Sequence, residues 1–326
     1  MNNERLKPCQ GKVSRNPHNY RETFLAYAAL IRYRQCHWAQ EQALELVRAL
    51  DRDLIKGRLD YSHNPLTGKI PESKDPMVHE KGHPWFDGTA TTGRALEGLM
   101  TLFTVFQREE IKNLAQRMAE HHLAFTIHPE GSPRQEIFDP ENIGHNHSYH
   151  GTLKGLFLYG LATRNTDSLE AVHQTYRRVL QCGVVHRSGW TPHDLGDFRF
   201  LNAFGEPLAD PASAGDSAQL ALWLASRHGQ NDLFEDVKRL VGFRLLPSQM
   251  TRQEWLQLPE DERHPRELGS WRIHRLPHSQ KGCTPDVHAA VLHSLCDIYE
   301  TLGDLDLESE SAHCQSEEWK ETMVSG

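Results

Sequence analysis

Residues 151–180 have the sequence GTLKGLFLYGLATRNTDSLEAVHQTYRRVL, which contains two helical patterns separated by a short polar turn. The first, GTLKGLFLYGLA, is apolar or small on almost every side, and such a helix has to be buried. The second, LEAVHQTYRRVL, has one apolar stripe and a charged face, so it packs on the first helix and meets water on its other side. The stretch therefore predicts a helical hairpin with an inner and an outer helix.

The same hairpin recurs along the chain. Apolar inner segments begin at residues 24, 93, 151, 217 and 288. Repeated hairpins of this kind bury their apolar faces on one another. The fold class we predict is all-α: an (α/α)n toroid or barrel of five to six helical hairpins, with long loops at one end. The periodicity predicts helices over 21–34, 38–56, 90–107, 109–126, 151–164, 167–182, 216–228, 231–247 and 286–302.

Long loops separate several of these helices, and they are rich in Pro, Gly, Asp and His: 57–89, 127–150, 183–215 and 248–285. Loops of that length in a compact domain are usually functional or disordered. In a toroid every inner helix runs in the same direction, so the segments that precede these helices meet at one mouth. We predict a binding site there, in a single domain spanning 1–326 with a core of about 20–302 and a polar, acidic tail over 303–326.

Composition narrows the classes of partner. With 36 Lys+Arg against 44 Asp+Glu the net charge is −8, which argues against nonspecific binding to nucleic acid or anionic lipid. The sequence contains no 18-residue apolar run and no apolar signal segment near its first residues. The 6 cysteines form no CxxC pair. We therefore expect a cytoplasmic protein with reduced thiols and without a nucleic-acid or membrane partner.

Histidine is over-represented, with 21 residues, and three of them lie in HNHSYH just before an inner helix: His145, His147 and His150. Imidazole exchanges protons near neutral pH and binds metals. Contact with a polar ligand, metal binding and loop hydrogen bonding all stay open here. Because no acidic or thiol partner stands nearby, we predict no metal site.

The segment WFDGT supplies Trp85 and Asp87, and Arg94 follows in the next inner helix. An aromatic face can stack on a sugar ring, and a carboxylate can bind its hydroxyls. The alternative is local: Asp87 caps the helix and Trp85 packs as a hydrophobic staple. Arg94 is either an anion contact or a salt-bridge residue.

The segment GWTPHDLGD contains Trp190, His193 and Asp194 within five positions. A carboxyl group in a partly apolar mouth has a raised pKa and can serve as a general acid, which is the role we predict for Asp194. The segment SAGDSAQ places Asp216 at the start of an inner helix, where either Ser213 or Asp216 is expected to cap that helix.

The last loop contributes KGCTPDVH, with Cys283, Asp286 and His288, and upstream of it Trp271. A thiol at a helix N-terminus has a lowered pKa and an exposed nucleophile, although a buried cysteine commonly acts as a small hydrophobic residue.

Together the segments WFDGTATTGRALEGL, GHNHSYHGTLKGLFLYG, GWTPHDLGD, SAGDSAQLALWLA and KGCTPDVHAAVLHSL resemble the core of six-hairpin glycosidases, nearest to the β-L-arabinofuranosidase type, glycoside hydrolase family 127. The resemblance covers about residues 20–302. It implies an (α/α)6 toroid that acts on β-linked furanosides with a cysteine nucleophile held on zinc.

The cysteine–zinc motif of that family is not retained in this sequence. Its paired cysteines would fall on Gly282 and Cys283, and its Glu-x-Cys motif near Ala214 and Asp216. The first cysteine of the pair is thus glycine, and Cys283 matches a metal ligand rather than the nucleophile. We therefore predict no cofactor, with zinc disfavoured, and carboxylate or histidine chemistry in the same mouth.

The leading functional hypothesis is a glycoside hydrolase in which Asp194 is the general acid and Asp87 or Asp216 supplies the second carboxylate. A lyase is the first alternative: a histidine or Tyr149 would abstract a proton beside a uronate carboxylate that Arg94 neutralises. A catalytically inactive toroidal binding or scaffold protein is the second. The expected partner is a small carbohydrate, with a homo-oligomer left open. The substrate-binding residues we predict are Trp85, Arg94, His145, His147, His150, Trp190, His193, Trp271, Cys283, Asp286 and His288.

Overall fold

The computed structural model describes residues 17–55, 58–59, 90–125, 127, 130–131, 146–185, 191, 210–260, 263, 268–271 and 285–303. The chain divides into two compact units. The first comprises Met1–Arg178 with Asp194–Asp197, and the second comprises Val179–His193 with Phe198–Gly326.

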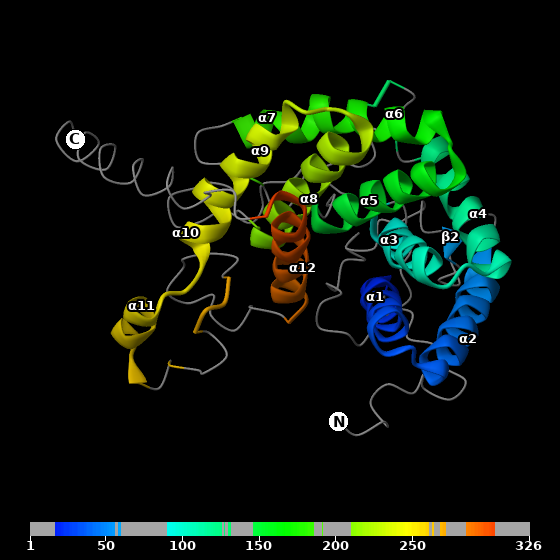
Figure 1. Cartoon of the computed structure of the whole chain (residues 1–326), viewed down its shortest axis with the longest axis horizontal. Helices are drawn as coiled ribbons and strands as arrows, with labels where there is room; N and C mark the ends of the chain where they lie inside the picture. The colour runs from blue at the N-terminus through cyan, green and yellow to red at the C-terminus, as the bar shows by residue number, and fades with distance from the viewer. Residues whose placement is uncertain are drawn as a thin grey trace, which may run out of the picture. The chain divides into compact units, whose positions relative to one another are not determined.

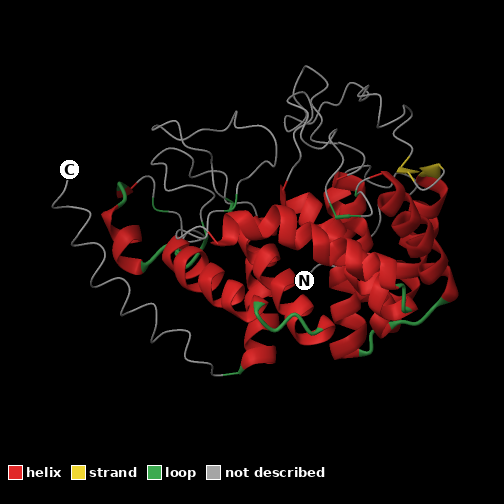
Figure 2. Ribbon diagram, turned by 90° about the horizontal axis from the view of Figure 1, so that it is seen from above, coloured by secondary structure: helices red, strands yellow, loops and turns green. Residues whose placement is uncertain are grey.

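The first unit is built from helical hairpins (Figure 1). Its helices are α1 (Pro17–Arg34), α2 (His37–Asp53), α3 (Ala90–Val105), α4 (Glu109–Phe125), α5 (Asn146–Thr163) and α6 (Thr166–Thr175). Helix α3 packs between α1 and α5, while α2, α4 and α6 pack on the outside of these three. After α2, strand β1 (Leu54–Ile55) pairs antiparallel with β2 (Arg58–Leu59), and these are the only strands drawn in the described part of the chain (Figure 2).

The predicted difference between inner and outer helices is confirmed. In α5 every residue from Asn146 to Gly160 is buried, whereas α6 buries only one side: Ser168, Ala171, Val172 and Thr175. The side chain of Asn165 caps α6 by accepting a hydrogen bond from the Ser168 amide, 2.9 Å away. The apolar pattern of 151–164 and the striped pattern of 167–182 thus yield the burial that hydrophobicity requires.

The second unit repeats the arrangement with α8 as its central inner helix. Its elements are α7 (Gln181–Val185), α8 (Pro211–His228), α9 (Leu233–Leu240), the π-helical turn η6 (Val241–Leu245), α10 (Leu246–Ser248), α11 (Arg252–Gln257) and α12 (Pro285–Leu302). The π-helical turn η5 (Tyr176–Leu180) leads from α6 into α7 across the boundary between the units.

Helix α8 packs against α9 on one side and α12 on the other. Ala212 clusters with Val287 and Ala290, and further along α8 both Gln219 and Trp223 donate hydrogen bonds to Asp297. Early residues of α8 therefore meet early residues of α12, and later residues meet later ones. The two inner helices run in the same direction, as the toroid predicts.

Four inner helices end in the same way. Gln35, Arg164, Gly229 and Gly303 have left-handed backbones, with φ of 48°, 57°, 76° and 63°, and each directly follows an inner helix: α1, α5, α8 and α12 respectively. A left-handed residue after the last turn stops a helix and turns the chain away.

The predicted starts of three inner helices need correction. Helix α1 begins at Pro17 and not at 21. Helix α5 begins at Asn146 and not at 151, so HNHSYH is mostly helical rather than a loop. Helix α8 begins at Pro211 and not at 216, and its N-cap is Asp210, whose carboxylate accepts from the Ala212 amide at 2.9 Å. The expectation that Ser213 or Asp216 caps α8 is therefore wrong. The overlooked signal is an Asp followed by Pro at the first helical position.

Two further boundaries differ. Helix α2 ends at Asp53, because the chain then enters β1, where the prediction had helix to residue 56. Helix α11 lies in a stretch that we expected to be loop. Thr251 and Glu254 form a capping box there, and the spacing T-x-x-E is the sequence pattern that predicts one. No helix in the described ranges combines the length and the hydropathy needed to cross a membrane.

Candidate functional site

The first turns of α1, α3 and α5 meet in the first unit. Arg94 donates a hydrogen bond from its guanidinium to Glu22 Oε1 at 2.5 Å, which joins α3 to α1. Arg21 Nη1 lies 3.2 Å from His147 Nε2, which joins α1 to α5. All four residues lie in the first two turns of their helices. The like-oriented starts of these three inner helices therefore deliver polar side chains to one place.

Beneath this meeting point lies a fully buried ion network. Arg21 Nε donates to Glu97 Oε2 at 2.6 Å, and Lys154 Nζ lies 2.9 Å from Glu97 Oε1. The side chains of Glu97 and Lys154 are completely buried. One carboxylate thus joins cations from the two neighbouring helices, and removing one partner of such a buried pair leaves the others uncompensated.

The geometry fixes the protons on two histidines of the first turn of α5. A guanidinium has no acceptor, so His147 Nε2 accepts from Arg21 and the neutral ring carries its hydrogen on Nδ1. His150 Nδ1 lies 2.9 Å from the Asn146 carbonyl oxygen, which only accepts, so this nitrogen carries the hydrogen of His150. The two rings are therefore held in defined tautomers and orientations.

Glu22, like Arg21 and Glu97, is a residue of this site that the sequence analysis did not predict. Its Oε1 accepts from Arg94 and lies 3.3 Å from Arg21 Nη1, while its Oε2 is buried and has no hydrogen-bond partner among the described residues. The side chain as a whole is 31% exposed. A charged pair, Arg21–Glu22, at the head of an otherwise apolar inner helix was the available signal.

Glycines let α3 and α5 approach closely enough to form the network. A Cβ on Gly155 would lie 2.6 Å from the Glu97 backbone nitrogen, and one on Gly151 would lie 3.1 Å from Arg94 Cγ. Neither distance leaves room for a methyl group without movement of α3. The glycine-rich pattern of the inner helix therefore has a direct role in positioning Glu97 and Arg94.

Two further histidines are packed on the outer side of this interface, in α4. His122 is completely buried, and its ring contacts that of His121 edge-on at a centroid distance of 5.2 Å. A Cβ on Gly93 would lie 2.9 Å from His122 Cε1, so α3 packs closely against the ring of His122. Burial, with a smaller contribution from His121, holds the pKa of His122 well below its ordinary value.

In the second unit, Asp216 lies in the second turn of α8 and is completely buried. The neighbouring Gly215 faces α12, since a Cβ there would lie 3.2 Å from Ser294 Oγ. His288 stands at the start of α12 with its ring edge-on to Trp271, at a centroid distance of 6.5 Å. Trp271 is buried and donates its indole N–H to the Leu245 carbonyl at 2.8 Å. The sequence predicted a sugar contact for Trp271 and did not predict this packing role.

Arg94, His147 and His150 are thus brought together in the first unit, and Asp216, Trp271 and His288 lie in the second. Arg94 takes the salt-bridge role that was one of its two expected roles. The side chains of the other predicted site residues lie outside the described residues, and their roles stay predictions: Trp85, Asp87, His145, Trp190, His193, Asp194, Cys283 and Asp286.

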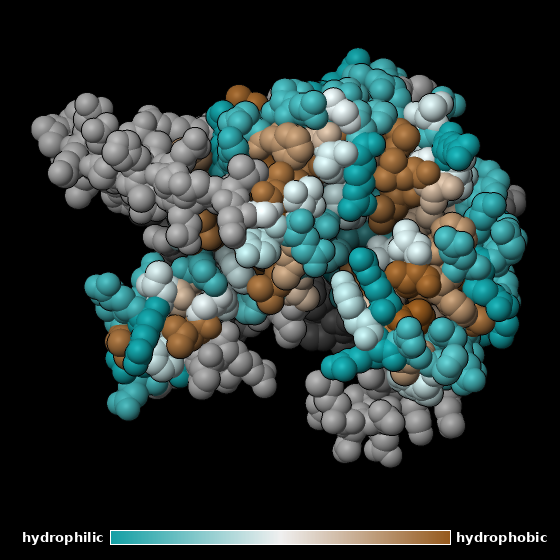
Figure 3. Space-filling model, in the orientation of Figure 1, coloured by the Kyte–Doolittle hydropathy of each residue, from teal (hydrophilic) through white to brown (hydrophobic). Residues whose placement is uncertain are grey.

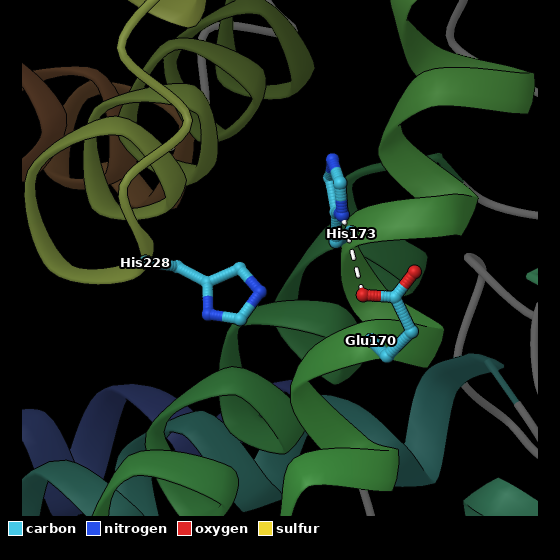
Figure 4. Close-up of side chains that lie close together, drawn as sticks. All are labelled: Glu170, His173 and His228. Carbon is cyan, nitrogen blue, oxygen red and sulfur yellow. Dashed lines mark hydrogen bonds and ion pairs between the residues drawn. The ribbon is translucent and has the colours of Figure 1, made fainter.

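An ion pair on the outer helix α6 is separate from this site (Figure 4). His173 Nδ1 lies 3.5 Å from Glu170 Oε2, and Arg177 donates to His173 Nε2 at 3.2 Å. Both ring nitrogens of His173 therefore have partners within the first unit. Figure 4 also draws His228, which belongs to the end of α8 in the second unit.

Comparison with known proteins gives structural but no sequence matches. No family model matches the chain, and no curated protein matches it. A UGL variant with dGlcA-Glc-Rha-Glc is similar at a TM-score of 0.59 and 17% identity, covering 90% of this chain and 77% of its own. The unsaturated glucuronyl hydrolase from Bacillus sp. GL1 gives 0.58 and 15%, covering 87% and 74%. A D-mannose isomerase gives 0.55 and 12%, covering 91% and 73%.

The chain has an α/α toroid fold. The α/α toroid that the sequence predicts is therefore confirmed. At these identities the likeness establishes the fold, while the reaction has to be argued from the residues.

Proposed function

We propose that this chain is a carbohydrate-processing enzyme, a glycoside hydrolase whose site lies at the N-terminal ends of the inner helices. The observation that carries the proposal is the meeting of Glu22, Arg94 and His147 from three sequence-distant inner helices at one point. Convergence of polar side chains on a rigid scaffold is the usual construction of a small-molecule site. The toroid structures similar to this chain include a glucuronyl hydrolase and a sugar isomerase, which agrees with this substrate class.

In this proposal Asp194 is the general acid, and Asp87 or Asp216 provides the second carboxylate. The acid protonates the leaving oxygen, and the second carboxylate either attacks the sugar or activates a water molecule. Arg94 and Arg21 fix the carboxylate of Glu22, and the contacts of His147 Nε2 with Arg21 and of His150 Nδ1 with the Asn146 carbonyl hold both rings in fixed tautomers. Neither step needs a metal ion or an organic cofactor.

A second candidate is a lyase acting on uronates, and one observation favours it. Arg21 and Arg94 place two guanidiniums at the meeting point, where an anionic sugar would find charge complementarity. The carboxylate of Glu22 pairs with both of them, and Arg21 is also paired with Glu97. A uronate carboxylate and Glu22 would therefore compete for the same cations, whereas a neutral sugar would leave them paired.

The deciding experiment is a screen of aryl glycosides against uronate-containing oligosaccharides. Wild type is compared with Asp194→Asn and Cys283→Ser, and with Glu120→Gln on the exposed face of α4 as the control. We expect turnover of a glycoside that falls by about 10²–10⁴ in Asp194→Asn and is unchanged in the control. Formation of an unsaturated uronate product would establish the lyase. Loss of turnover in Cys283→Ser alone would favour a cysteine-dependent mechanism, and absence of turnover on every substrate would favour a binding or scaffold protein.

A further inference from the structure

Glu22, in the second turn of α1, has one carboxylate oxygen that is paired and one that is not. Oε1 accepts a hydrogen bond from Arg94 and lies 3.3 Å from Arg21 Nη1. Oε2 is buried and has no hydrogen-bond partner among the described residues. A buried acceptor without a donor costs free energy, so such a group is usually satisfied by a water molecule or a ligand. Oε2 is therefore available to a bound molecule that brings a donor.

The charges around Glu22 restrict what that molecule can be. The guanidiniums of Arg21 and Arg94 both lie against Oε1, and they would repel an ammonium group beside it. The carboxylate of Glu22 would itself repel an anion. A neutral donor remains, and the commonest neutral donor of a carbohydrate is a hydroxyl group, which offers one O–H. The surroundings of Oε2 thus suit a sugar hydroxyl.

The side of α1 that carries Glu22 is open to solvent. Its side chain is 31% exposed, and the residues three, four and seven positions further along the same side are half-buried or exposed: Leu25, Ala26 and Ala29. Hydrophobic and hydrophilic residues lie side by side on the surface over α1 and α3 (Figure 3). A sugar ring has apolar C–H faces and polar edges, so it can pack on small apolar side chains while a hydroxyl reaches Glu22.

The second unit has a carboxylate at the same register. Helices α1 and α8 each have 18 residues and are followed by a left-handed residue, and their sixth residues are Glu22 and Asp216. The fifth residue of each faces the next inner helix: Arg21 pairs with Glu97 in α3, and a Cβ on Gly215 would lie 3.2 Å from a side chain of α12. The repeated hairpin thus places Glu22 where α8 has Asp216, one of the carboxylates proposed to act on the substrate.

We propose that Glu22 is a substrate-binding residue whose Oε2 accepts a hydrogen bond from a hydroxyl group of a neutral sugar. This role rests on the proposed carbohydrate-processing function and specifies its substrate class. Arg21 and Arg94 position the carboxylate and stay paired with Oε1 when the neutral sugar binds. A uronate would have to displace Glu22 from the same guanidiniums, so Glu22 selects neutral sugars over acidic ones.

The test measures sugar binding to the full-length chain as the rise in melting temperature during a titration. The probes are neutral methyl hexopyranosides and methyl pentofuranosides, with D-glucuronate and D-galacturonate as the acidic set. Glu22→Gln places an amide nitrogen at Oε2, because Arg94 requires the acceptor at Oε1. Glu22→Asp keeps the charge but withdraws it by one methylene group, and Glu120→Gln on the exposed face of α4 is the control.

We expect at least one neutral glycoside to stabilise the wild type. Its affinity should fall at least about tenfold in both Glu22 variants and stay unchanged in Glu120→Gln, since the hydroxyl loses a charged acceptor. Melting temperatures without ligand show whether each variant is folded, and Glu22→Asp decides the question if Glu22→Gln is unfolded.

Equal affinity of the wild type and the Glu22 variants for a neutral glycoside would overturn the proposal, as would the absence of stabilisation by every neutral probe. Binding of D-glucuronate or D-galacturonate that is tighter in Glu22→Gln than in the wild type would assign the guanidiniums to an anion, which also overturns it.

Failure of the proposed reaction gives a different result. If Glu22→Gln weakens the binding of a neutral glycoside but the wild type hydrolyses no aryl glycoside, the hydrolase proposal fails and the role of Glu22 stands. If aryl glycosides are hydrolysed with the same KM in the wild type and Glu22→Gln, the role of Glu22 fails and the hydrolase proposal stands.

Discussion

The two units hold their inner helices together by different means. In the first unit the interface of α3 with α1 and α5 buries an ion network, in which Glu97 joins Arg21 and Lys154. In the second unit the described polar contacts between α8 and α12 are hydrogen bonds from Gln219 and Trp223 to Asp297, a residue that is only half-buried. The same hairpin architecture therefore tolerates both solutions, and the buried network coincides with the candidate site.

The network is expected to be the most sensitive part of the molecule. Glu97→Gln leaves Arg21 and Lys154 buried beside a neutral amide, and removing one partner of a buried ion pair costs about 3–5 kcal/mol. We expect a loss of unfolding free energy of that size in urea denaturation. A loss below about 1 kcal/mol would mean that the network does not hold α1, α3 and α5 together.

The corresponding change in the second unit should cost less. Asp297→Asn keeps an acceptor for Gln219 and Trp223 but removes its charge, and charge-assisted hydrogen bonds are worth about 1.5–3 kcal/mol. Because Asp297 is half-buried, we expect the lower end of that range in the same denaturation experiment. A cost equal to that of Glu97→Gln would remove the contrast between the units.

Glycine-to-alanine substitutions in the two units should change stability in opposite directions. Gly155→Ala in α5 forces a methyl group against the backbone of Glu97 and Leu96, and overpacking of this kind costs about 1–3 kcal/mol. Gly242→Ala in η6 meets nothing within 4 Å and should stabilise by about 0.4–1 kcal/mol, because alanine restricts the unfolded chain. Melting temperatures should move in opposite directions. A shared direction would contradict the close approach of α3 and α5.

The last prediction concerns the pH dependence of stability. Because the pKa of His122 is lowered in the folded state, the unfolded chain takes up a proton below about pH 6.5 that the native state does not. Stability should therefore fall as the pH is lowered from 6.5 toward the folded pKa, with a slope from this residue of at most about 1.4 kcal/mol per pH unit. Denaturation at several pH values should show a shallower slope in His122→Leu. An unchanged slope would mean that other groups cause the acid sensitivity.

Much of the fold follows from hydrophobic patterning. Inner helices were predicted from the apolar segments at 93, 151 and 217, and outer helices from the striped segments that follow them. A helix buried on all sides is apolar all round, and a helix buried on one side has a single apolar stripe. The starts of α5 and α8 were placed too late, since Asn146, His147 and Ser213 are polar and yet buried. Their burial depends on partners that are distant in sequence.

The meeting of inner-helix starts was predictable, but the residues that take part in it were less so. The prediction named Arg94 and His147, which contact Glu22 and Arg21 there, whereas Arg21, Glu22 and Glu97 were missed. Arg21 pairs with Glu97 across 76 residues, and no local pattern encodes such a pairing. Lys154 within GTLKGLF was the available clue, because a lone lysine in an apolar helix needs a buried counter-charge.

The left-handed turns have a practical consequence for engineering. Gln35, Arg164 and Gly229 follow the C-terminal ends of α1, α5 and α8, so these tight reversals lie at the opposite ends of the helices from the polar first turns where we propose the site. Peptide tags or fluorophores inserted beside Arg164 or Gly229 should therefore report on folding without obstructing a bound sugar.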